Sequence, residues 1–375
     1  MSTQSGGEIG PRFAAPPSIA PLGRTEPLLF GELPGLRALP FVPLAHVPTP
    51  LEPATAIHDY LGRGGVFVKR DDLASPLYGG NKVRRYEYVL ADALAQHKRR
   101  IVTAGGIAST QAMATALFGR ALGLSVDIVL FDQPVTRFAK EALLVDATAG
   151  AHLVWGGGYA RTAWRTWRAL GDDAYLILPG AATPLANLGY IDAMLELRDQ
   201  VARGEMPRPD AIIVPTGSSG TLAALALGAA HLGWDTEIVG VRITARIACN
   251  RLTIGSVIGA TDRFLATHDA RWTRRRRDAR FSVFHGAIGA GYGHPTKDAR
   301  EAIEVMRRLS GQPGEVTYSG KALAGLRALG RSRRWRKKTL LLWSTLSTPR
   351  PDVAADAALR LPPRLRRILT EPEVA

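Results

Sequence analysis

Short apolar runs that alternate with amphipathic stretches constrain the fold of this chain more than any other feature. Apolar residues recur three and four positions apart, as in helices, at 84–96, 111–122, 136–147, 187–203, 221–232 and 297–309. The apolar runs around them are expected to be strands at Val66–Lys69, Arg100–Ala104, Val126–Phe131, His152–Trp155, Tyr175–Pro179, Ala211–Pro215, Glu237–Ile243 and Thr339–Trp343. Strands that alternate with helices predict an α/β fold whose parallel sheets are covered by helices on both faces.

The rest of the chain limits what kind of protein this can be. Residues 1–40 are rich in proline and glycine and are expected to form an extended leader, and residues 351–375 are expected to form an appended tail. No apolar run approaches the roughly 20 residues needed to cross a bilayer, and no secretory signal is visible, so a cytoplasmic protein is expected. The single cysteine, Cys249, excludes an internal disulfide framework, and the histidines show no metal-binding spacing, so no metal site is expected.

The formal net charge of +15 comes from three short basic clusters. They lie at 271–280, 331–338 and 360–367, and outside them basic and acidic residues nearly balance. An acidic partner such as a nucleic acid is one interpretation, but nucleic-acid binders usually gather their basic residues on one face or along one groove. Three separate clusters favour solvated loops and a solvated tail, and no nucleic-acid or membrane partner is expected.

A glycine pair and a lysine at a helix start form the first candidate site. The segment Gly79-Gly80-Asn81-Lys82 follows one predicted strand and leads into the helix at 84–96. Glycines let a ligand approach the backbone closely, and the helix dipole disfavours a cation on the first turn, which would lower the pKa of the lysine. A partly neutral lysine is what imine chemistry needs. A solvated lysine beside a tight turn is the alternative that these four residues leave open.

The second candidate site follows the strand at 211–215. The segment 216–221, Thr-Gly-Ser-Ser-Gly-Thr, leads into an apolar helix, an arrangement in which backbone N–H groups and hydroxyls hold a phosphate. The spacing matches neither a Walker loop nor Gly-x-Gly-x-x-Gly, so a single phosphate group fits better than a nucleoside triphosphate or a dinucleotide. An ordinary strand-to-helix turn is the alternative.

A third strand, turn and helix at 103–111 offers hydroxyls and small residues where a substrate carboxylate would meet a helix N-terminus. Alone it carries little weight. Together, a lysine for an imine, a cradle for one phosphate and a carboxylate site indicate pyridoxal phosphate and an amino-acid substrate.

With these sites the sequence resembles the D-cysteine desulfhydrase and 1-aminocyclopropane-1-carboxylate deaminase family of fold-type II, tryptophan-synthase-β-like pyridoxal-phosphate enzymes. The resemblance covers about residues 40–348. The matching motifs are Lys69-Arg70-Asp71-Asp72-Leu73, Gly79-Gly80-Asn81-Lys82-Val83-Arg84-Arg85-Tyr86-Glu87, the turn from Gly105 to Gln111, Gly189-Tyr190, Thr216 to Thr221, Gly291-Tyr292-Gly293 and Tyr318-Ser319-Gly320-Lys321-Ala322.

This resemblance implies two open, twisted, mostly parallel sheets flanked by helices. A small domain at 85–190 would be inserted into a large cofactor-binding domain made of 41–84 and 191–350. Pyridoxal phosphate would lie in the cleft between them, at the carboxyl ends of the strands. A homodimer is also expected.

The resemblance further implies a role for each matching residue. Lys82 would hold the cofactor as an imine and move the substrate Cα proton, Arg85 would contact the phosphate, and Ser109 would bind the substrate carboxylate. Tyr292 and Tyr318 would act as acid–base groups beside the reacting carbons. The implied cofactor-binding residues are Asn81, Lys82, Arg85, Thr110, Gly217, Ser218, Ser219, Gly220, Thr221, Ser319 and Thr345, and the implied substrate-binding residues are Ser109, Thr110 and Gln111.

Three positions depart from the pattern of the family. Thr110 stands where the family has asparagine, and Leu346 replaces a glycine near the cofactor ring. Ser319 stands where the cyclopropane-ring deaminases have a glutamate that pairs with the pyridine nitrogen, and a neutral hydroxyl there makes the ring a weaker electron sink. Expelling a thiol tolerates a weaker sink than opening an unactivated ring does, although Gln111 matches the deaminase branch.

The sequence therefore predicts a pyridoxal-phosphate-dependent lyase or deaminase. Its expected reaction is β-elimination from a small, D-cysteine-like amino acid, which gives a 2-oxo acid and ammonia. The alternatives are a ring-opening deaminase, a family member with altered or lost turnover, and a nucleic-acid-associated protein.

Overall fold

Two separate sheets organise the computed structural model, which describes residues 9–19, 23–311 and 314–374. The strands are β1 (Leu51–Pro53), β2 (Val66–Lys69), β3 (Arg100–Gly106), β4 (Ser125–Phe131), β5 (His152–Gly157), β6 (Ala174–Ile177), β7 (Ala211–Thr216), β8 (Glu237–Arg242), β9 (Phe281–Phe284) and β10 (Leu340–Trp343). The larger sheet has the order β1-β2-β10-β7-β8-β9, the smaller one has the order β5-β4-β3-β6, and all pairs except β1–β2 are parallel. The predicted α/β fold with two mostly parallel sheets is confirmed, and all eight predicted strands are present.

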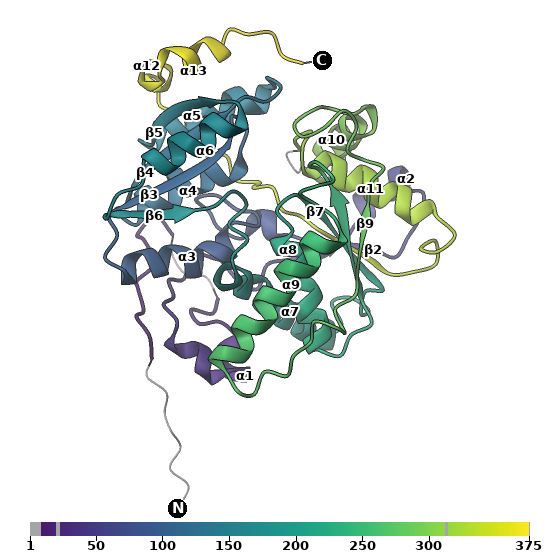
Figure 1. The fold of residues 1–375 in the computed structure, drawn as a ribbon. Helices are drawn as coiled ribbons and strands as arrows, with labels where there is room; N and C mark the ends of the chain where they lie inside the picture. The colour runs from purple at the N-terminus through teal and green to yellow at the C-terminus, as the bar shows by residue number, and fades with distance from the viewer. Residues whose placement is uncertain (1–8, 20–22, 312–313, 375) are drawn as a thin grey trace, which may run out of the picture.

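Helices cover both sheets, as Figure 1 shows. The longer ones are α3 (Val83–Ala95), α4 (Thr110–Ala121), α5 (Arg137–Thr148), α6 (Tyr159–Arg168), α7 (Pro184–Ala202), α8 (Gly220–His231), α9 (Arg251–His268), α10 (Lys297–Ser310) and α11 (Ser319–Arg331). The short ones are α1 (Leu29–Glu32), α2 (His58–Leu61), α12 (Ala357–Arg360) and α13 (Pro363–Ile368), with 3-10 turns at Pro34–Ala38, Thr55–Ile57 and Asp71–Leu73. Among the described helices, none combines the length and the apolar character needed to span a membrane.

A buried network of ion pairs fixes the start of α3, the helix that follows Lys82. The Arg84 guanidinium lies 3.0 Å from the Asp71 carboxylate and 2.9 Å from that of Glu196 on α7. Lys69 on β2 donates to the same Glu196 carboxylate at 2.6 Å. Because removing one partner would leave an uncompensated charge in the interior, the network ties β2, α3 and α7 to one arrangement.

The N-terminal segment differs from the extended leader that the sequence predicts. Residues 29–32 form the helix α1, and the Phe30 ring packs edge-on against Phe41 at 5.9 Å and Tyr88 at 6.2 Å between centroids. Apolar side chains in this segment therefore find a place in the core of the larger sheet, which the high proline and glycine content conceals. The part of the prediction at residues 1–8 and 20–22 lies outside the described residues.

The C-terminal segment also differs from the solvated tail that was expected. Figure 1 shows α12 and α13 lying over α5, on the outer side of the smaller sheet. Leu361, Leu365 and Ile368 are buried in the core of that sheet, and the backbone N–H of Ala354 donates to the Thr148 hydroxyl at 3.0 Å. Leu365 and Ile368 lie three residues apart on one face of α13, and Leu361 directly follows α12.

Candidate active site

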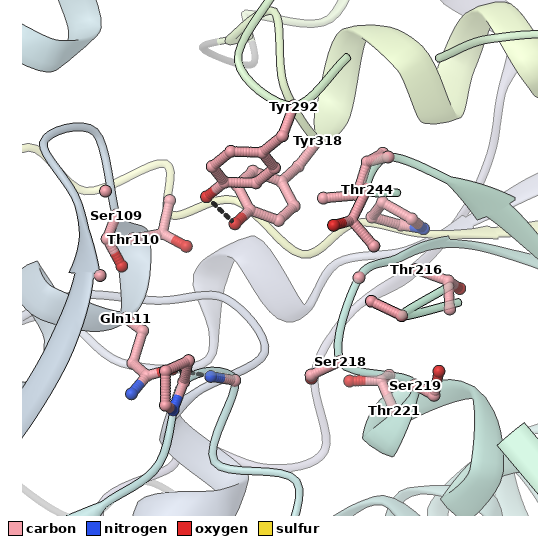
Figure 2. A pocket seen from close by; sticks show the side chains of 18 of the residues that line it. Ser109, Thr110, Gln111, Thr216, Ser218, Ser219, Thr221, Thr244, Tyr292 and Tyr318 are labelled. Atoms are coloured by element: carbon pink, nitrogen blue, oxygen red, sulfur yellow. Dashed lines mark hydrogen bonds between the residues drawn. The ribbon is translucent and has the colours of Figure 1, made fainter. Parts of the chain in front are cut away.

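A cavity of about 360 Å³ lies between the two sheets, at the carboxyl ends of β3, β4, β7 and β8. Figure 2 shows its polar side chains converging from both sides. The predicted site residues that line it are Asn81, Lys82, Ser109, Thr110, Gln111, Gly217, Ser218, Ser219, Thr221, Tyr292 and Tyr318. Segments that lie more than 200 residues apart in the chain thus meet in one cavity.

Lys82 precedes α3 and lies in a buried position at the cavity wall. Its ammonium donates to the Asn81 side-chain oxygen at 3.2 Å, and only 8% of the residue is exposed. Burial, and secondarily the nearby Arg85 cation, lower the pKa of Lys82 from 10.5 to about 7. The lysine is therefore partly a neutral, nucleophilic amine near neutral pH, as a result of its burial and of the Arg85 charge.

The loop before α8 provides donors that suit one phosphate group. Ser218 and Thr221 line the cavity beside the first turn of α8, where backbone N–H groups lack intrahelical acceptors. Ser219 adopts a left-handed conformation with φ of +70°, which is uncommon for a residue other than glycine and typical of functional turns. Hydroxyls and backbone donors at a helix N-terminus, with two buried cations nearby, fit a phosphate ester.

Arg85 supports this loop from behind. Its guanidinium donates to the Thr221 hydroxyl at 2.8 Å and to the carbonyls of Gly180 and Ala181 at 2.8 and 2.9 Å. Arg85 does not line the cavity, so its effect on a phosphate passes through Thr221. Burial lowers the pKa of this guanidinium to about 10.

The start of α4 forms the opposite wall of the cavity. Ser109 caps this helix, and its hydroxyl accepts a hydrogen bond from the Ala112 N–H at 3.2 Å. Thr110 lies beside it in Figure 2. A substrate carboxylate would meet these hydroxyls and the unsatisfied N–H groups of the first turn.

The Gln111 side chain is already engaged with protein atoms. Its amide nitrogen donates to the Thr103 hydroxyl at 2.9 Å and to the Leu178 carbonyl at 3.1 Å, and its oxygen accepts from the Gly180 N–H. Gln111 therefore holds the 178–180 loop, which forms part of the cavity wall.

Two tyrosines close the cavity on the side of the larger sheet. The hydroxyl oxygens of Tyr292 and Tyr318 lie 2.7 Å apart, as the dashed line in Figure 2 marks. Burial raises the pKa of Tyr292 to about 12 and raises that of Tyr318 further above its usual value. Both phenols are protonated at neutral pH and can donate a proton to a developing anion.

Two buried charged groups position this pair. The Lys321 ammonium donates to the carbonyls of Ile288 and Gly291 at 2.8 and 2.9 Å and so holds the loop that carries Tyr292. The Glu315 carboxylate accepts the backbone N–H groups of residues 317–319 and so fixes the backbone of Tyr318.

Four residues predicted to contact the cofactor do not line the cavity: Arg85, Gly220, Ser319 and Thr345. The Ser319 hydroxyl accepts from the Glu315 N–H at 2.9 Å and donates to its carbonyl at 3.2 Å. Local bonding of this kind is typical of serine at the start of a helix, here α11. Thr345 contributes only its carbonyl, which accepts from the Asn81 N–H at 3.2 Å, and Leu346 belongs to the hydrophobic core. The structure therefore gives no support for a contact of the Ser319 or Thr345 side chain with the cofactor.

Sequence reasoning missed an aromatic row at the mouth of the cavity. The Tyr159 ring packs in a tilted arrangement against Phe131 at 4.8 Å between centroids, and the Phe131 centroid lies 6.5 Å from that of Tyr292. Tyr159 lines the cavity although 71% of it is exposed. The glycines at 156–158, after a predicted strand, were a signal for a functional turn at this position.

Two parallel sheets, with a buried lysine and a phosphate-binding helix start in the cleft between them, define a pyridoxal-phosphate enzyme of fold type II. The family model described as pyridoxal-phosphate dependent enzyme matches residues 42–345. The chain belongs to this family, and the predicted cofactor is pyridoxal phosphate, as the family requires.

Individual relatives agree with this assignment. A D-cysteine desulfhydrase of Salmonella choleraesuis (strain SC-B67) is 31% identical over 309 residues, which are 78% of this chain and 88% of the relative. The crystal structure of an ACC deaminase homologue matches with a TM-score of 0.71 and 26% identity, covering 86% of this chain and 95% of the other. A fungal L-serine ammonia-lyase from Rhizomucor miehei, with a TM-score of 0.59 and 17% identity over 81% of this chain and 95% of its own, shares the fold.

Proposed function

We propose that this protein eliminates the β-substituent of a small, D-cysteine-like amino acid and releases a 2-oxo acid and ammonia. The observation that carries the proposal is the single cavity that joins Lys82, a phosphate-binding helix start and the Tyr292–Tyr318 pair. The relatives named D-cysteine desulfhydrase, at about 30% identity over most of the chain, support the choice of substrate class.

The residues of the cavity divide into binding groups and proton-transfer groups. Pyridoxal phosphate supplies an electron sink for the Cα carbanion when it is bound. Lys82 would hold it, and Ser218, Thr221 and the first N–H groups of α8 would hold its phosphate. Ser109 would orient the substrate carboxylate at the start of α4, so that the Cα–H bond faces the lysine.

Proton transfers account for the elimination, and hydrolysis of the resulting enamine by water then gives the 2-oxo acid and ammonia. The Lys82 amine, with its pKa near 7, would take the proton from Cα. The Cβ–S bond then breaks, sulfur leaves with the electron pair, and a tyrosine of the 292–318 pair donates a proton to it. The high pKa values of the two phenols keep that proton available at neutral pH.

The cavity favours elimination over opening of a cyclopropane ring. Among the described residues, no aspartate or glutamate lines it, so a pyridine nitrogen would meet no carboxylate that keeps it protonated. That makes the ring a weak electron sink and favours a good leaving group such as a thiol. Gln111 is the residue that matched the deaminase branch. Its side-chain amide is hydrogen-bonded to Thr103 and to the 178–180 loop.

Product analysis tests this proposal. The purified enzyme with pyridoxal phosphate is incubated with D-cysteine, L-cysteine and 1-aminocyclopropane-1-carboxylate, and sulfide, ammonia and 2-oxo acids are measured. We expect sulfide and pyruvate from a cysteine enantiomer, little 2-oxobutanoate from the cyclopropane, and no turnover by a folded Lys82→Ala variant. Efficient 2-oxobutanoate release without sulfide would establish the ring-opening reaction instead, and no turnover of any substrate would indicate a lost activity.

We also propose that the enzyme acts as a cytoplasmic homodimer. Trp164 and Trp167 on α6 are 55% and 66% exposed, and a second copy covering such aromatic side chains would remove them from water. Light scattering after gel filtration gives the molar mass, and a Trp164→Ser/Trp167→Ser variant should become monomeric. A wild-type monomer would contradict the dimer.

A further inference from the structure

Two of the three basic clusters of the sequence meet at one edge of the larger sheet. Segment 271–280 joins α9 to β9, and segment 331–338 joins α11 to β10, so both lead into the amino ends of parallel strands (Figure 1). Only β7 and β8 lie between β9 and β10. With neighbouring strands about 4.8 Å apart, the two segments end within roughly 15 Å of one another. We call the surface formed by 271–280 and 331–338 the basic edge.

Carboxylates at the strand starts tie the two segments together. Arg334 pairs with Glu237 at the start of β8, and Arg280 pairs at 3.2 Å with Asp235, two residues earlier. Arg280 and Arg334, which lie more than 50 positions apart in the sequence, therefore bind carboxylates of the same short segment, residues 235–237. The basic edge is a continuous surface in the fold, which the sequence, with its separate clusters, did not indicate.

Each segment is also anchored by a buried tryptophan. Trp272 is 4% exposed, and its indole N–H donates to the Asp262 carboxylate at 3.0 Å. Trp335 is 7% exposed, and the Arg334 guanidinium lies 4.5 Å above its ring centroid. These anchors hold the arginines at defined positions, so they differ from charges on freely moving solvated loops.

The basic edge carries a large excess of unpaired positive charge. Five of its twelve cations pair with carboxylates. The other seven are exposed and have no carboxylate partner within the described part of the chain: Arg271, Arg276, Arg277, Arg331, Arg333, Arg336 and Lys337. Such a one-sided charge attracts a polyanion.

We propose that the basic edge binds the phosphate backbone of a double-stranded nucleic acid without regard to sequence. The edge is dominated by arginine, whose planar fork matches phosphate oxygens. Both of its aromatic side chains, Trp272 and Trp335, are buried, and its one other apolar residue, Ala279, is only partly exposed. No exposed aromatic side chain is therefore available to stack on the bases of a single strand, and no exposed apolar one to insert into a membrane surface, whereas contacts to duplex phosphates need only the cations.

The basic edge lies away from the cavity. β7 and β8 begin at this edge, and their carboxyl ends lead to Thr216 and Thr244, which line the cavity. Each has six residues, which span about 20 Å. A duplex bound at the basic edge would therefore leave the cavity open. Duplex binding should not depend on bound pyridoxal phosphate or on turnover.

Fluorescence anisotropy with a labelled DNA duplex of about 20 base pairs, titrated between about 50 and 200 mM salt, tests the proposal. We expect the affinity to fall with salt, with a log–log slope of about −3.6 for about four phosphate contacts. The variants Arg333→Glu/Arg336→Glu and Arg276→Glu/Arg277→Glu change each segment separately. The control Arg99→Glu/Arg367→Glu makes the same charge change at exposed residues around the smaller sheet.

Each segment variant should bind about tenfold or more weakly at low salt and should show a shallower slope, since about two phosphate contacts are lost. The control should bind within about threefold of wild type, and all variants should keep the visible absorbance of the bound cofactor. Equal losses in the control would show a general effect of net charge and overturn the proposal. Absence of duplex binding, or tighter binding to vesicles of anionic lipid than to the duplex, would overturn it as well.

Discussion

The hydroxyl oxygens of Tyr292 and Tyr318 share a hydrogen bond of 2.7 Å at the wall of the cavity. In such a pair one hydroxyl donates to the other, so only one of the two protons is free for a third group. The phenol that donates the bond stabilises negative charge on the oxygen of its partner. The phenol that accepts the bond stabilises negative charge on the donor's oxygen less. The pair therefore acts as one proton-transfer unit, although the two residues come from different segments.

Removing either hydroxyl should disable this unit. We expect Tyr292→Phe and Tyr318→Phe each to lower kcat for β-elimination by about 10²- to 10⁴-fold, the range for loss of a general acid. The double variant should cost little more than the worse single one, since residues that act as a unit are not additive. Steady-state kinetics on the three variants measure this. Fully multiplicative losses would mean that the tyrosines act independently.

The amine of Lys82 sets the pH dependence of cofactor uptake. Burial first, and Arg85 second, lower its pKa from 10.5 to about 7, and only the neutral amine attacks an aldehyde. In the cofactor-free protein the rate of pyridoxal phosphate capture should therefore rise through about pH 7 and level off above it. Stopped-flow absorbance measures this midpoint.

An Arg85→Met variant tests whether the Arg85 charge lowers the pKa of Lys82. Without the cation the midpoint should move to higher pH, while Arg85→Lys keeps the charge and should hold it closer to the wild-type value. A wild-type midpoint near the ordinary pKa of lysine would contradict the effect of burial.

Lys321 should act as a positioning residue for Tyr292. Its ammonium donates to two carbonyls of the 288–291 loop, and Lys321 does not line the cavity. Lys321→Met should lower kcat by about 10²-fold, as for a misplaced catalytic group, while KM and cofactor absorbance stay near wild type. Lys297→Met, which removes an exposed lysine, is the matched control. Loss of cofactor binding in Lys321→Met would indicate a general structural role instead.

The sequence predicted the strands well because buried parallel strands are continuous apolar runs. It missed the short strands β1 and β9 and the helix α11. It also missed α6, whose exposed Trp164 and Trp167 obscure the inward face, and α9, whose buried positions Ile254, Ile258 and Leu265 are widely spaced. The order of elements along the chain predicts that Lys82 and the loop before α8 lie near each other, because each follows a strand at the same edge of the larger sheet.

Side-chain direction was harder to predict than backbone position. Ser319 follows Tyr318 directly, yet its hydroxyl turns to the Glu315 backbone rather than to the cavity. Tyr159 reaches the cavity because the smaller sheet places the turn after β5 near the larger sheet. Neither fact follows from spacing, since both depend on rotamers and on contacts between distant segments.

The C-terminal segment should contribute to the stability of the smaller-sheet core. Leu365 is fully buried there, whereas Leu359, in the same segment, is 72% exposed. Leu365→Ala should lower the free energy of unfolding by about 2–5 kcal/mol, and Leu359→Ala should change it by about 0.5 kcal/mol or less. Urea denaturation followed by circular dichroism compares the two. Equal, small effects would mean that the segment is not part of the folded core.

The aromatic row at the mouth of the cavity should influence which β-substituents are accepted. Tyr159 lines the cavity while largely exposed, and it packs against Phe131, so an incoming aromatic side chain would meet a ring surface at the entrance. Because a stacking contact contributes about 0.5–1.5 kcal/mol, Tyr159→Ala should lower kcat/KM for S-benzyl-cysteine by up to about tenfold. Cysteine itself offers no ring and should lose much less. Leu252→Ala, which truncates an exposed residue on α9 outside the cavity lining, is the control, and kinetics are measured with both substrates on both variants. Equal losses for the two substrates would show that Tyr159 shapes the cavity as a whole rather than selecting the substituent.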